Sequence, residues 1–328
     1  MTDNCVLVTG GAGYIGSHAT LALLATGRRV VVVDNLVTSR RELVPDAAEF
    51  VEMDIADSER MAALLRKHRC RAILHFAGST VVPESVENPL KYYRNNTGAS
   101  RNLLEAAVEQ GVDKFIFSST AAVYGNPEKL PVDESVSLDP VSPYGKSKLM
   151  TENMLQDIAA SSDLRFIALR YFNVAGADPE GRTGQSTPEA THLIKAACEA
   201  ACGRRENITV FGDDYDTPDG TGVRDFIHVT DLAEAHVAAL DYLEQGGASN
   251  VMNCGYGRGY SVKQVLDTLR AVSGKELRVE TGPRRPGDIG EIYADAKRIR
   301  DVLGWVPQHD DLEKIVASAY AWEQRAAS

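Results

Sequence analysis

Short apolar runs alternate with helical patterns over the first half of the chain, and this alternation constrains the fold more than any other feature. Most of the runs are apolar along their whole length, which is typical of strands buried on both faces of a parallel sheet. Helical patterns such as Ser58–His68 and Arg101–Gln110 supply the crossovers between them. The sequence therefore predicts a doubly wound α/β fold with a parallel sheet. The predicted strands are Asn4–Gly10, Arg28–Asp34, Glu49–Asp54, Arg71–Gly78, Lys114–Ala121 and Arg165–Val174.

The first run ends in VTGGAGYIGSH, a glycine pattern that follows a strand and opens a helix. Gly10, Gly13 and Gly16 have Gly-x-x-Gly-x-x-Gly spacing. Without side chains, the backbone can turn tightly and approach a pyrophosphate, whose charge meets the positive end of the helix. The pattern in this context predicts a dinucleotide site.

Residues after the second and third runs extend this predicted site. Asp34 is placed to accept a hydrogen bond from an adenosine ribose and to repel a 2′-phosphate, which favours NAD over NADP. Arg40 and Arg41 lie close enough in the sequence to leave that preference open. Asp54 and Ile55 lie where an adenine amine and ring face are expected. We therefore expect NAD as the cofactor.

The segment SPYGKSK places Tyr144 and Lys148 on one face at the start of a helix. Ligands of such sheets bind beyond the carboxyl ends of the strands, so Thr120 is expected beside them at the nicotinamide. These three side chains form a proton-transfer set for hydride transfer at a carbinol carbon. A cation about 5 Å from a phenol contributes about 3 kcal/mol at an effective dielectric near 20, or about two pKa units. We therefore expect Lys148 and the nicotinamide ring to bring the pKa of Tyr144 near neutrality.

The strand–helix rhythm breaks after Val174. Loop-rich segments then alternate with helical patterns at His192–Cys202, Asp231–Gln245 and Ser261–Ser273. We predict a Rossmann domain at 1–174 to which 225–250 return, and a smaller, partly interleaved α/β substrate lobe at 175–224 and 251–328.

The composition of the chain limits the classes of partner that it is expected to bind. The 328-residue chain carries a formal net charge of −11 without a long basic run, which argues against nucleic acid and against a membrane surface. No apolar stretch approaches the roughly 18 residues of a transmembrane helix, and the start MTDNC lacks the order of a signal peptide. Five cysteines predict reduced thiols in the cytoplasm. Cys198 and Cys202 share a helix face without a histidine or carboxylate pattern, so no metal site is predicted.

These motifs together resemble the UDP-glucose 4-epimerases of the extended short-chain dehydrogenase/reductase superfamily. The resemblance spans nearly the whole chain and rests on VTGGAGYIGSH, DNL, HFAG, SSTAAVYG, SPYGKSK, RYFNVAGA, GDDYDTPDGTGVRDFIHV and RRPGD. It implies NAD-dependent inversion of C4 in a UDP-hexose through a 4-keto sugar. Tyr144 then takes the proton of the 4-hydroxyl, Thr120 hydrogen-bonds the same oxygen, and Lys148 contacts the nicotinamide ribose and lowers the pKa of Tyr144.

The resemblance also implies how the UDP-sugar is bound. Arg224 and Arg285 lie in loop-rich segments, and the planar fork of arginine suits diphosphate oxygens. Asn173 is expected at the phosphates or the sugar, Phe211 near the uracil, and Asp288 at the uridine ribose.

Further residues are assigned only by the resemblance. Relatives pair through helices equivalent to Tyr92–Gln110 and Tyr144–Ile158, so a homodimer is expected. The remaining substrate residues are His192, Leu193 and Ile292. The remaining cofactor residues are Tyr14, Ile15, Asn35, Phe76, Ala77, Gly78, Asn95, Ser118 and Phe172.

Some positions depart from the family pattern. Ser79 and Thr80 replace a Leu-Lys pair whose lysine helps to hold the cofactor, which predicts weaker NAD retention. His192 and Lys195 replace the usual Asn and Pro. Ile292 occupies the position whose bulk sets tolerance for 2-acetamido sugars, and its intermediate size leaves that tolerance open.

Other activities stay open to different degrees. A 4-epimerase of UDP-glucuronate or UDP-N-acetylglucosamine would use the same chemistry. A nucleotide-sugar 4,6-dehydratase needs an Asp-Glu pair directly after Thr120, where this chain has Ala121 and Ala122. A non-catalytic NAD-sensing protein would have no need of Tyr144 and Lys148.

Overall fold

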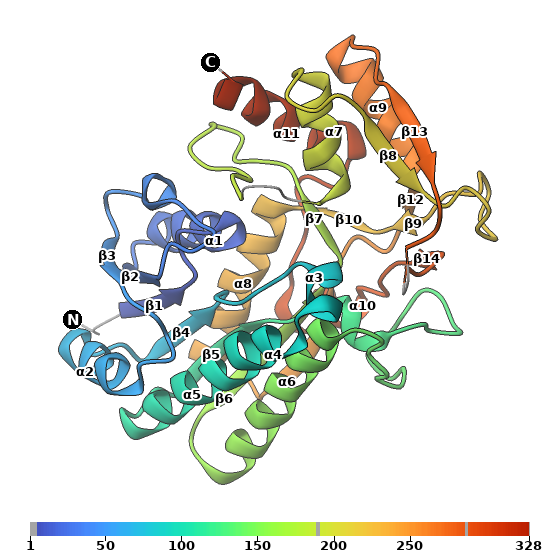
Figure 1. Ribbon diagram of the computed structural model, residues 1–328. Coiled ribbons are helices and arrows are strands. Elements are labelled where there is room, and N and C mark those ends of the chain that lie inside the picture. Colours follow the sequence, from blue (N-terminus) through green and yellow to red (C-terminus); the bar gives the residue numbers. More distant parts are fainter. Residues whose placement is uncertain (1–4, 188–190, 286–287, 328) are drawn as a thin grey trace.

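A parallel seven-stranded sheet forms the centre of the computed structural model, which describes residues 5–187, 191–285 and 288–327 (Figure 1). The strand order is β11-β6-β5-β4-β1-β2-β3, and every neighbouring pair is parallel. This confirms the predicted doubly wound α/β fold. The strands are β1 (Cys5–Thr9), β2 (Arg29–Asp34), β3 (Glu49–Glu52), β4 (Ala72–His75), β5 (Lys114–Ser118), β6 (Arg165–Tyr171) and β11 (Asn250–Cys254).

Helices cover both faces of the sheet, and successive strand residues face opposite cores. Val6 and Val8 of β1 belong to the core with α1 (Tyr14–Ala25) and α8 (Val229–Glu244). Cys5 and Leu7 belong to the other core, with α2 (Ser58–His68), α5 (Ala99–Glu109) and α6 (Pro143–Ser161). Because both faces are buried, the strands read as nearly continuous apolar runs.

The direction of winding reverses between β1 and β4. The chain runs from β1 outward to β3 and then returns to β4 on the other side of β1. A Cβ on Gly10, whose φ is +70°, would lie 2.6 Å from the amide nitrogen of Ala77. The loops after β1 and β4 therefore meet at the reversal, which is where ligands bind in open α/β sheets.

Short elements connect β4 to α5 and follow β5. Helices α3 (Val82–Glu87) and α4 (Pro89–Tyr92) lead into a π-helical segment, Tyr93–Gly98, which continues directly into α5. The helix predicted from residue 101 therefore begins earlier. A 3₁₀ turn, Ala121–Tyr124, follows β5, and another, Arg41–Leu43, precedes β3.

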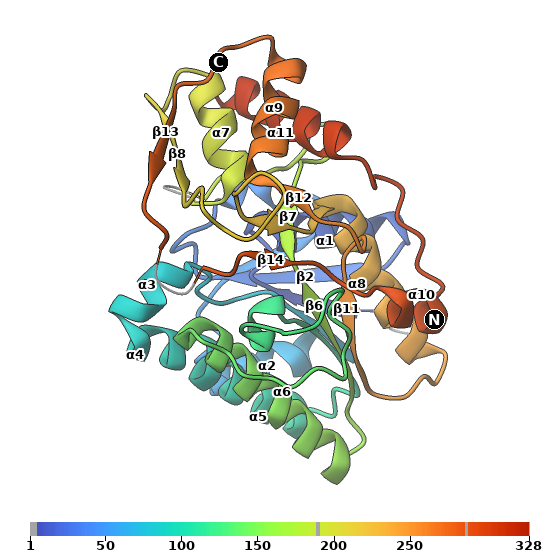
Figure 2. The same ribbon diagram turned by 90° about the vertical axis from the view of Figure 1, so that its right-hand side faces the viewer.

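A second lobe lies beyond the carboxyl ends of the strands (Figure 2). The helices predicted at 192–202, 231–245 and 261–273 are confirmed as α7, α8 and α9. The lobe contains helices α7 (Leu193–Ala201), α9 (Val262–Ser273) and α11 (Leu312–Ala327), and the strand pair β8 (Ile208–Phe211) and β13 (Val279–Gly282). Its other strands are β9 (Val223–Arg224), β12 (Tyr260–Ser261) and β14 (Glu291–Ile292).

Three elements join the lobe to the sheet. Strands β7 (Asn173–Ala175) and β10 (Phe226–His228) pair in parallel just beyond β6. Helix α10 (Lys297–Leu303) packs against β11 and α8. Because β11 lies in the main sheet, the return to the sheet ends at Cys254 rather than at residue 250.

Candidate active site

The glycine loop after β1 is shaped partly by the chain itself and partly for a ligand. A Cβ on Gly16 would lie 2.2 Å from the carbonyl oxygen of Gly10, so this position must be glycine for the chain to fold. A Cβ on Gly13 would meet only that same oxygen, at 3.2 Å, and Gly13 has an ordinary φ of −83°. Gly13 also caps α1 without a side-chain hydrogen bond, which leaves first-turn amides for an anion. The loop therefore fits a closely approaching pyrophosphate.

Asp34 connects this loop to the end of β2. Its Oδ2 accepts from the amide of Ala12 at 3.1 Å, and its Oδ1 accepts from the amide of Leu36 at 2.9 Å and from Ser39 Oγ at 2.6 Å. A carboxylate has about four acceptor sites, so one is left for a ribose hydroxyl.

The predicted adenine end lies beside it. Asn35 Nδ2 donates to Asp54 Oδ2 at 3.3 Å, and the side chain of Ile55 is buried. Arg41, which left the choice between NAD and NADP open, lies 4.7 Å from the centroid of the Phe50 ring. The guanidinium of Arg41 therefore packs on Phe50 of β3.

The loop after β4 is held by the π-helical segment. Ser79 donates its amide to Asn96 Oδ1 at 2.7 Å and accepts from Asn96 Nδ2 at 3.0 Å. Asn95 Nδ2 donates to Ser79 Oγ at 3.2 Å. Phe76 packs against His236, with ring centroids 4.7 Å apart. These contacts fix the segment Phe76–Gly78 next to the glycine loop.

The helix that carries the proton-transfer residues begins as its sequence predicts. Ser142 Oγ accepts from the amide of Gly145 at 3.1 Å, and Pro143 occupies the first helical position. This cap places Tyr144 in the first turn and Lys148 one turn later.

The structure brings Thr120, Tyr144 and Lys148 together at the carboxyl end of β5. Thr120 hydrogen-bonds the phenol of Tyr144, which is 6% exposed. Lys148 is 3% exposed, and its Nζ donates to the carbonyl of Ser118 at 3.0 Å. The same ammonium lies 4.9 Å from the centroid of the Phe117 ring.

The protein groups do not lower the pKa of Tyr144. Burial raises its pKa above the usual range, Tyr171 adds to the rise, and the hydrogen bond from Thr120 only partly opposes it. Burial also lowers the pKa of Lys148 to about 8, against the raising effect of Glu152. The ammonium of Lys148 is directed at the carbonyl of Ser118, so its lowering of the Tyr144 pKa in the filled site stays a prediction.

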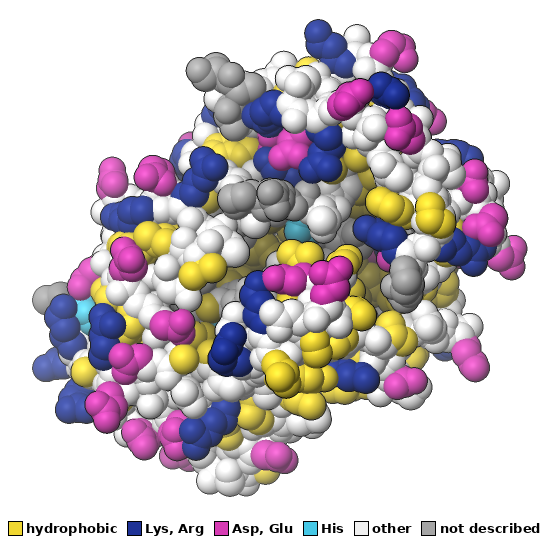
Figure 3. All heavy atoms as spheres, in the orientation of Figure 1, with side chains coloured by type: hydrophobic (Ala, Val, Ile, Leu, Met, Phe, Trp, Pro, Cys, Tyr) yellow, Lys and Arg dark blue, Asp and Glu magenta, His cyan; other side chains and the backbone are white. Residues whose placement is uncertain are grey.

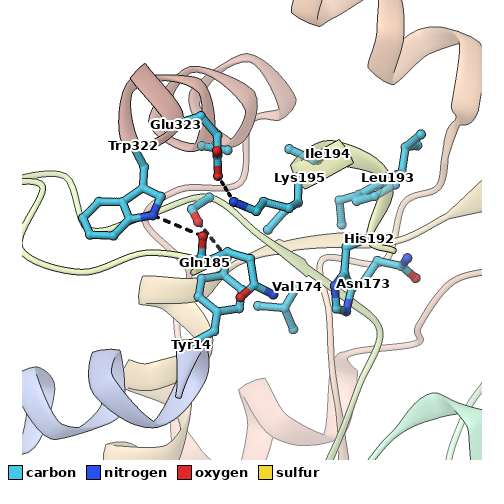
Figure 4. Close-up of a pocket in the computed structure, with 14 residues that line it drawn as sticks. Tyr14, Asn173, Val174, Gln185, His192, Leu193, Ile194, Lys195, Trp322 and Glu323 are labelled. Carbon is cyan, nitrogen blue, oxygen red and sulfur yellow. Dashed lines mark hydrogen bonds and ion pairs between the residues drawn. The ribbon is translucent and has the colours of Figure 1, made fainter. Parts of the chain in front are cut away.

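One group of predicted substrate residues lines a small cavity of about 30 Å³ between the glycine loop and the lobe (Figure 4). Asn173 of β7 and His192 and Leu193 at the start of α7 lie there with Tyr14, whose hydroxyl donates to the carbonyl of Gly176 at 2.6 Å. The glycine loop thus touches the lobe directly.

Charged and aromatic side chains from α7 and α11 form the far wall of this cavity. Lys195 forms an ion pair with the buried Glu323, as the dashed line in Figure 4 shows. Trp322 Nε1 donates to the carbonyl of Gln185 at 3.2 Å. The position where relatives have proline therefore carries a structural ion pair in this chain.

The second group of predicted substrate residues lies on the lobe. The guanidinium of Arg285 lies 4.8 Å from the centroid of Phe211, and its Nε donates to Asp288 Oδ2 at 2.8 Å. Phe211 is 39% exposed, so part of its ring is accessible to a ligand. Arg224 Nη2 donates to the carbonyl of Ile289 at 2.6 Å. Figure 3 shows the surface hollowed between the lobe and the sheet domain.

Ile292 joins the two parts of the site. It pairs with Arg224 between β14 and β9, and its buried side chain packs with Ala121 and Val123, which follow Thr120. Phe172 packs on the same cluster. Of the RRPGD motif, Pro286 and Gly287 lie outside the described residues.

Sequence reasoning missed three buried polar residues. The hydroxyl of Tyr215 is buried and has no partner among the described residues, and Arg284 lies 4.2 Å from its ring centroid. Glu152 and Arg170 form a buried ion pair behind Lys148. Only the spacing of Glu152, which follows Lys148 by four residues on the buried face of α6, could have indicated it.

No helix in the described parts of the chain is long and apolar enough to cross a membrane.

Residues 6–255 match the model of the family described as "NAD dependent epimerase/dehydratase family". The chain is 58% identical over 319 residues to a UDP-glucose 4-epimerase of Azospirillum brasilense, which covers 97% of this chain and 92% of that protein.

Solved structures of UDP-glucose 4-epimerases also resemble this chain over nearly its full length. A UDP-glucose 4-epimerase from Brucella ovis in complex with NAD matches with a TM-score of 0.95 and 44% identity over 98% of both chains. The enzyme from Bifidobacterium longum in complex with NAD⁺ and UDP matches with a TM-score of 0.93 and 37% identity, again over 98% of both chains.

Proposed function

This chain belongs to the NAD dependent epimerase/dehydratase family, and on that premise we propose that it inverts C4 of a UDP-hexose, with Thr120, Tyr144 and Lys148 as its catalytic residues. The cofactor is NAD. The observation that carries the assignment of residues is the buried cluster of these three side chains beside the glycine loop.

Each residue of the cluster has a distinct part in moving one proton. Tyr144 takes the proton from the sugar 4-hydroxyl and returns it after the sugar has turned over, and Thr120 hydrogen-bonds the same oxygen. Lys148 holds a positive charge at the carboxyl end of β5. Bound NAD⁺ would supply the acceptor for the C4 hydride, and its positive ring would favour the phenolate against the burial that raises the pKa of Tyr144. The phenol is thus prepared to ionise only when the site is filled.

The lobe binds the part of the substrate that stays still. Arg224 and Arg285 supply two positive charges for the diphosphate, while Phe211 offers an exposed ring to the uracil. Asp288, held by Arg285, accepts from the uridine ribose. Because these groups bind only the nucleotide, the hexose can rotate and present either face to Tyr144.

The test is direct. Purified protein is mixed with UDP-galactose and no added cofactor, and UDP-glucose is measured by chromatography. Tyr144→Phe should lower turnover by about 10³-fold, the scale of general acid–base catalysis, and keep NAD bound. Tyr242→Phe, which removes a phenol at the far end of α8, is the matched control and should keep full activity.

Parallel reactions distinguish the related activities. The same assay with UDP-glucuronate and with UDP-N-acetylglucosamine tests the other 4-epimerase activities. Mass spectrometry of each product identifies a 4,6-dehydratase, whose product has lost water. Full turnover by Tyr144→Phe, or UDP-galactose returned unchanged by the wild-type protein, would contradict the proposal.

We also propose that the chain forms a homodimer through the surface of α3 to α6. Exposed apolar side chains gather there (Figure 3): Val86 is 60% exposed, Leu90 76%, Val108 40% and Met150 43%. Such a patch is typical of a protein interface. In light scattering at micromolar concentration we expect a dimer for the wild type and a monomer for Leu90→Asp. Val37→Asp, at an equally exposed site elsewhere, should stay dimeric, and a wild-type monomer would reject the proposal.

A cytoplasmic location completes the proposal. The sparse, odd set of five cysteines supports it, because such sets are typical of reducing compartments. Fractionation of cells that express the chain at its native level tests it.

A further inference from the structure

A fully buried ion pair lies directly behind the catalytic lysine. Glu152 follows Lys148 by one turn of α6 and is 0% exposed, and Arg170 of β6 is 3% exposed. Arg170 Nη2 donates to Glu152 Oε2 at 2.5 Å and its Nε donates to Oε1 at 3.0 Å. The Nε–Nη2 edge of the guanidinium thus binds both carboxylate oxygens, as in the strongest charge-assisted pairs, while Nη1 donates to Tyr124.

The same carboxylate reaches the catalytic end of β5. Ser119 Oγ hydrogen-bonds to Glu152, and Ser119 lies between the two residues that matter most on this strand. Ser118 accepts from Lys148 on one side of it, and Thr120 hydrogen-bonds to Tyr144 on the other. Glu152 is therefore connected to both catalytic contacts through a single residue.

On the premise of the proposed function, we propose that Glu152 is a positioning residue that keeps Lys148 protonated while Tyr144 gives up its proton. A buried ion pair is weak evidence of a stabilising role, since apolar residues of the same volume often pack as well. The position of Glu152 between Lys148 and the end of β5 explains why an ion pair is present at this place.

The groups that face the ammonium of Lys148 show why it needs this partner. Glu152 lies on its own helix, and β5 contributes the carbonyl of Ser118 and the ring of Phe117. From β4 comes His75, whose pKa burial lowers to about 3, so this ring is neutral. Glu152 is the one carboxylate among the described residues that acts on Lys148, and it opposes the burial that lowers the pKa of Lys148 to about 8.

Glu152→Gln tests the proposal because it removes the charge and keeps an acceptor for Ser119. The acid limb of the kcat profile reports the proton that Tyr144 loses as the general base. Removal of a nearby negative charge eases that loss. We expect the acid limb to move to lower pH by about one unit and the plateau to fall about tenfold, because fewer molecules hold a charged lysine beside the phenolate.

Two further measurements separate this role from a structural one. The phenolate absorbance of Glu152→Gln is titrated against Tyr144→Phe as a blank, which follows the proton without turnover. The double variant Glu152→Gln/Arg170→Met removes the uncompensated arginine charge that could by itself unfold the single variant. Glu206→Gln is the matched control, since Glu206 pairs with Arg278 at the surface with 81% of its side chain exposed.

A shifted acid limb and a lowered plateau in the double variant support the inference. Restored wild-type kcat and an unmoved limb in the double variant would overturn it, because Glu152 would then only neutralise Arg170. Wild-type behaviour of Glu152→Gln overturns it equally. Failure of the wild-type protein to convert UDP-galactose would instead refute the proposed function, so the two failures are distinguishable.

Discussion

Gly13 and Gly16 offer a matched pair of substitutions that separates cofactor binding from folding. At Gly13, alanine fits the observed backbone and meets only the Gly10 carbonyl oxygen, at 3.2 Å. At Gly16, the same methyl group would lie 2.2 Å from that oxygen and 2.8 Å from the Cα of Gly11. Backbone atoms cannot turn away as a side chain can. We therefore expect Gly13→Ala to fold and Gly16→Ala to fold poorly.

The magnitudes follow from these distances. Replacing glycine with alanine at a compatible backbone stabilises by about 0.4–1 kcal/mol through the unfolded chain, which offsets the mild crowding at Gly13. Overpacking at Gly16 costs about 1–3 kcal/mol or more. The methyl group on Gly13 fills the approach of the pyrophosphate, so we expect NAD affinity to fall about 100-fold, or about 2.7 kcal/mol.

Thermal unfolding with and without NAD measures both effects. NAD at about 100 times its wild-type Kd stabilises by about 2.7 kcal/mol. For 328 residues with an unfolding entropy of about 2.1 cal/mol/K each, that is a rise in Tm of about 4 °C. For Gly13→Ala at the same concentration the rise should fall below about 1 °C, with an unchanged Tm in the absence of NAD. A full NAD-induced rise in Gly13→Ala would refute the argument that this position is glycine for the ligand.

Three further outcomes are expected. His75 is buried with its pKa lowered to about 3, so the unfolded state binds an extra proton below about pH 6.5. Stability is therefore lost as pH falls through that value, by about 2 kcal/mol at pH 5, and urea midpoints at pH 7 and 5 should differ less in His75→Gln. Thr80→Lys should raise the NAD occupancy of purified protein, and unchanged occupancy would show that this position does not control retention. Arg285→Met should raise KM for UDP-galactose about tenfold or more with little change in kcat, because we assign Arg285, which lies over the ring of Phe211, to the nucleotide rather than to the hexose.

The sheet and its cofactor loop were predictable because local sequence controls them. The strands are buried on both sides and so read as continuous apolar runs, such as the four valines of β2. The glycine spacing is local too, and Ser142 and Pro143 mark the start of α6 within two residues of Tyr144. In each case the residues that determine the structure are neighbours in the chain.

What could not be predicted depends on contacts between distant segments. Strand β11 reads as a weak, mixed run, NVMNC, and only its pairing with β6 places it in the main sheet. The ion pair of Glu152 with Arg170 joins a helix to a strand, so neither residue alone indicates a partner. The direction of the Lys148 ammonium depends on the carbonyl of Ser118, which no side-chain pattern reveals.

The late position of β11 in the chain bears on how the protein is made. A nascent chain that has left the ribosome as far as residue 249 already contains the other six strands, but β6 still has one unsatisfied polar edge. Such an edge is a template for pairing with other molecules. Synthesis from the N-terminus therefore leaves an aggregation-prone intermediate until residues 250–254 emerge. Premature termination within residues 172–249 is expected to yield aggregates rather than a stable cofactor domain.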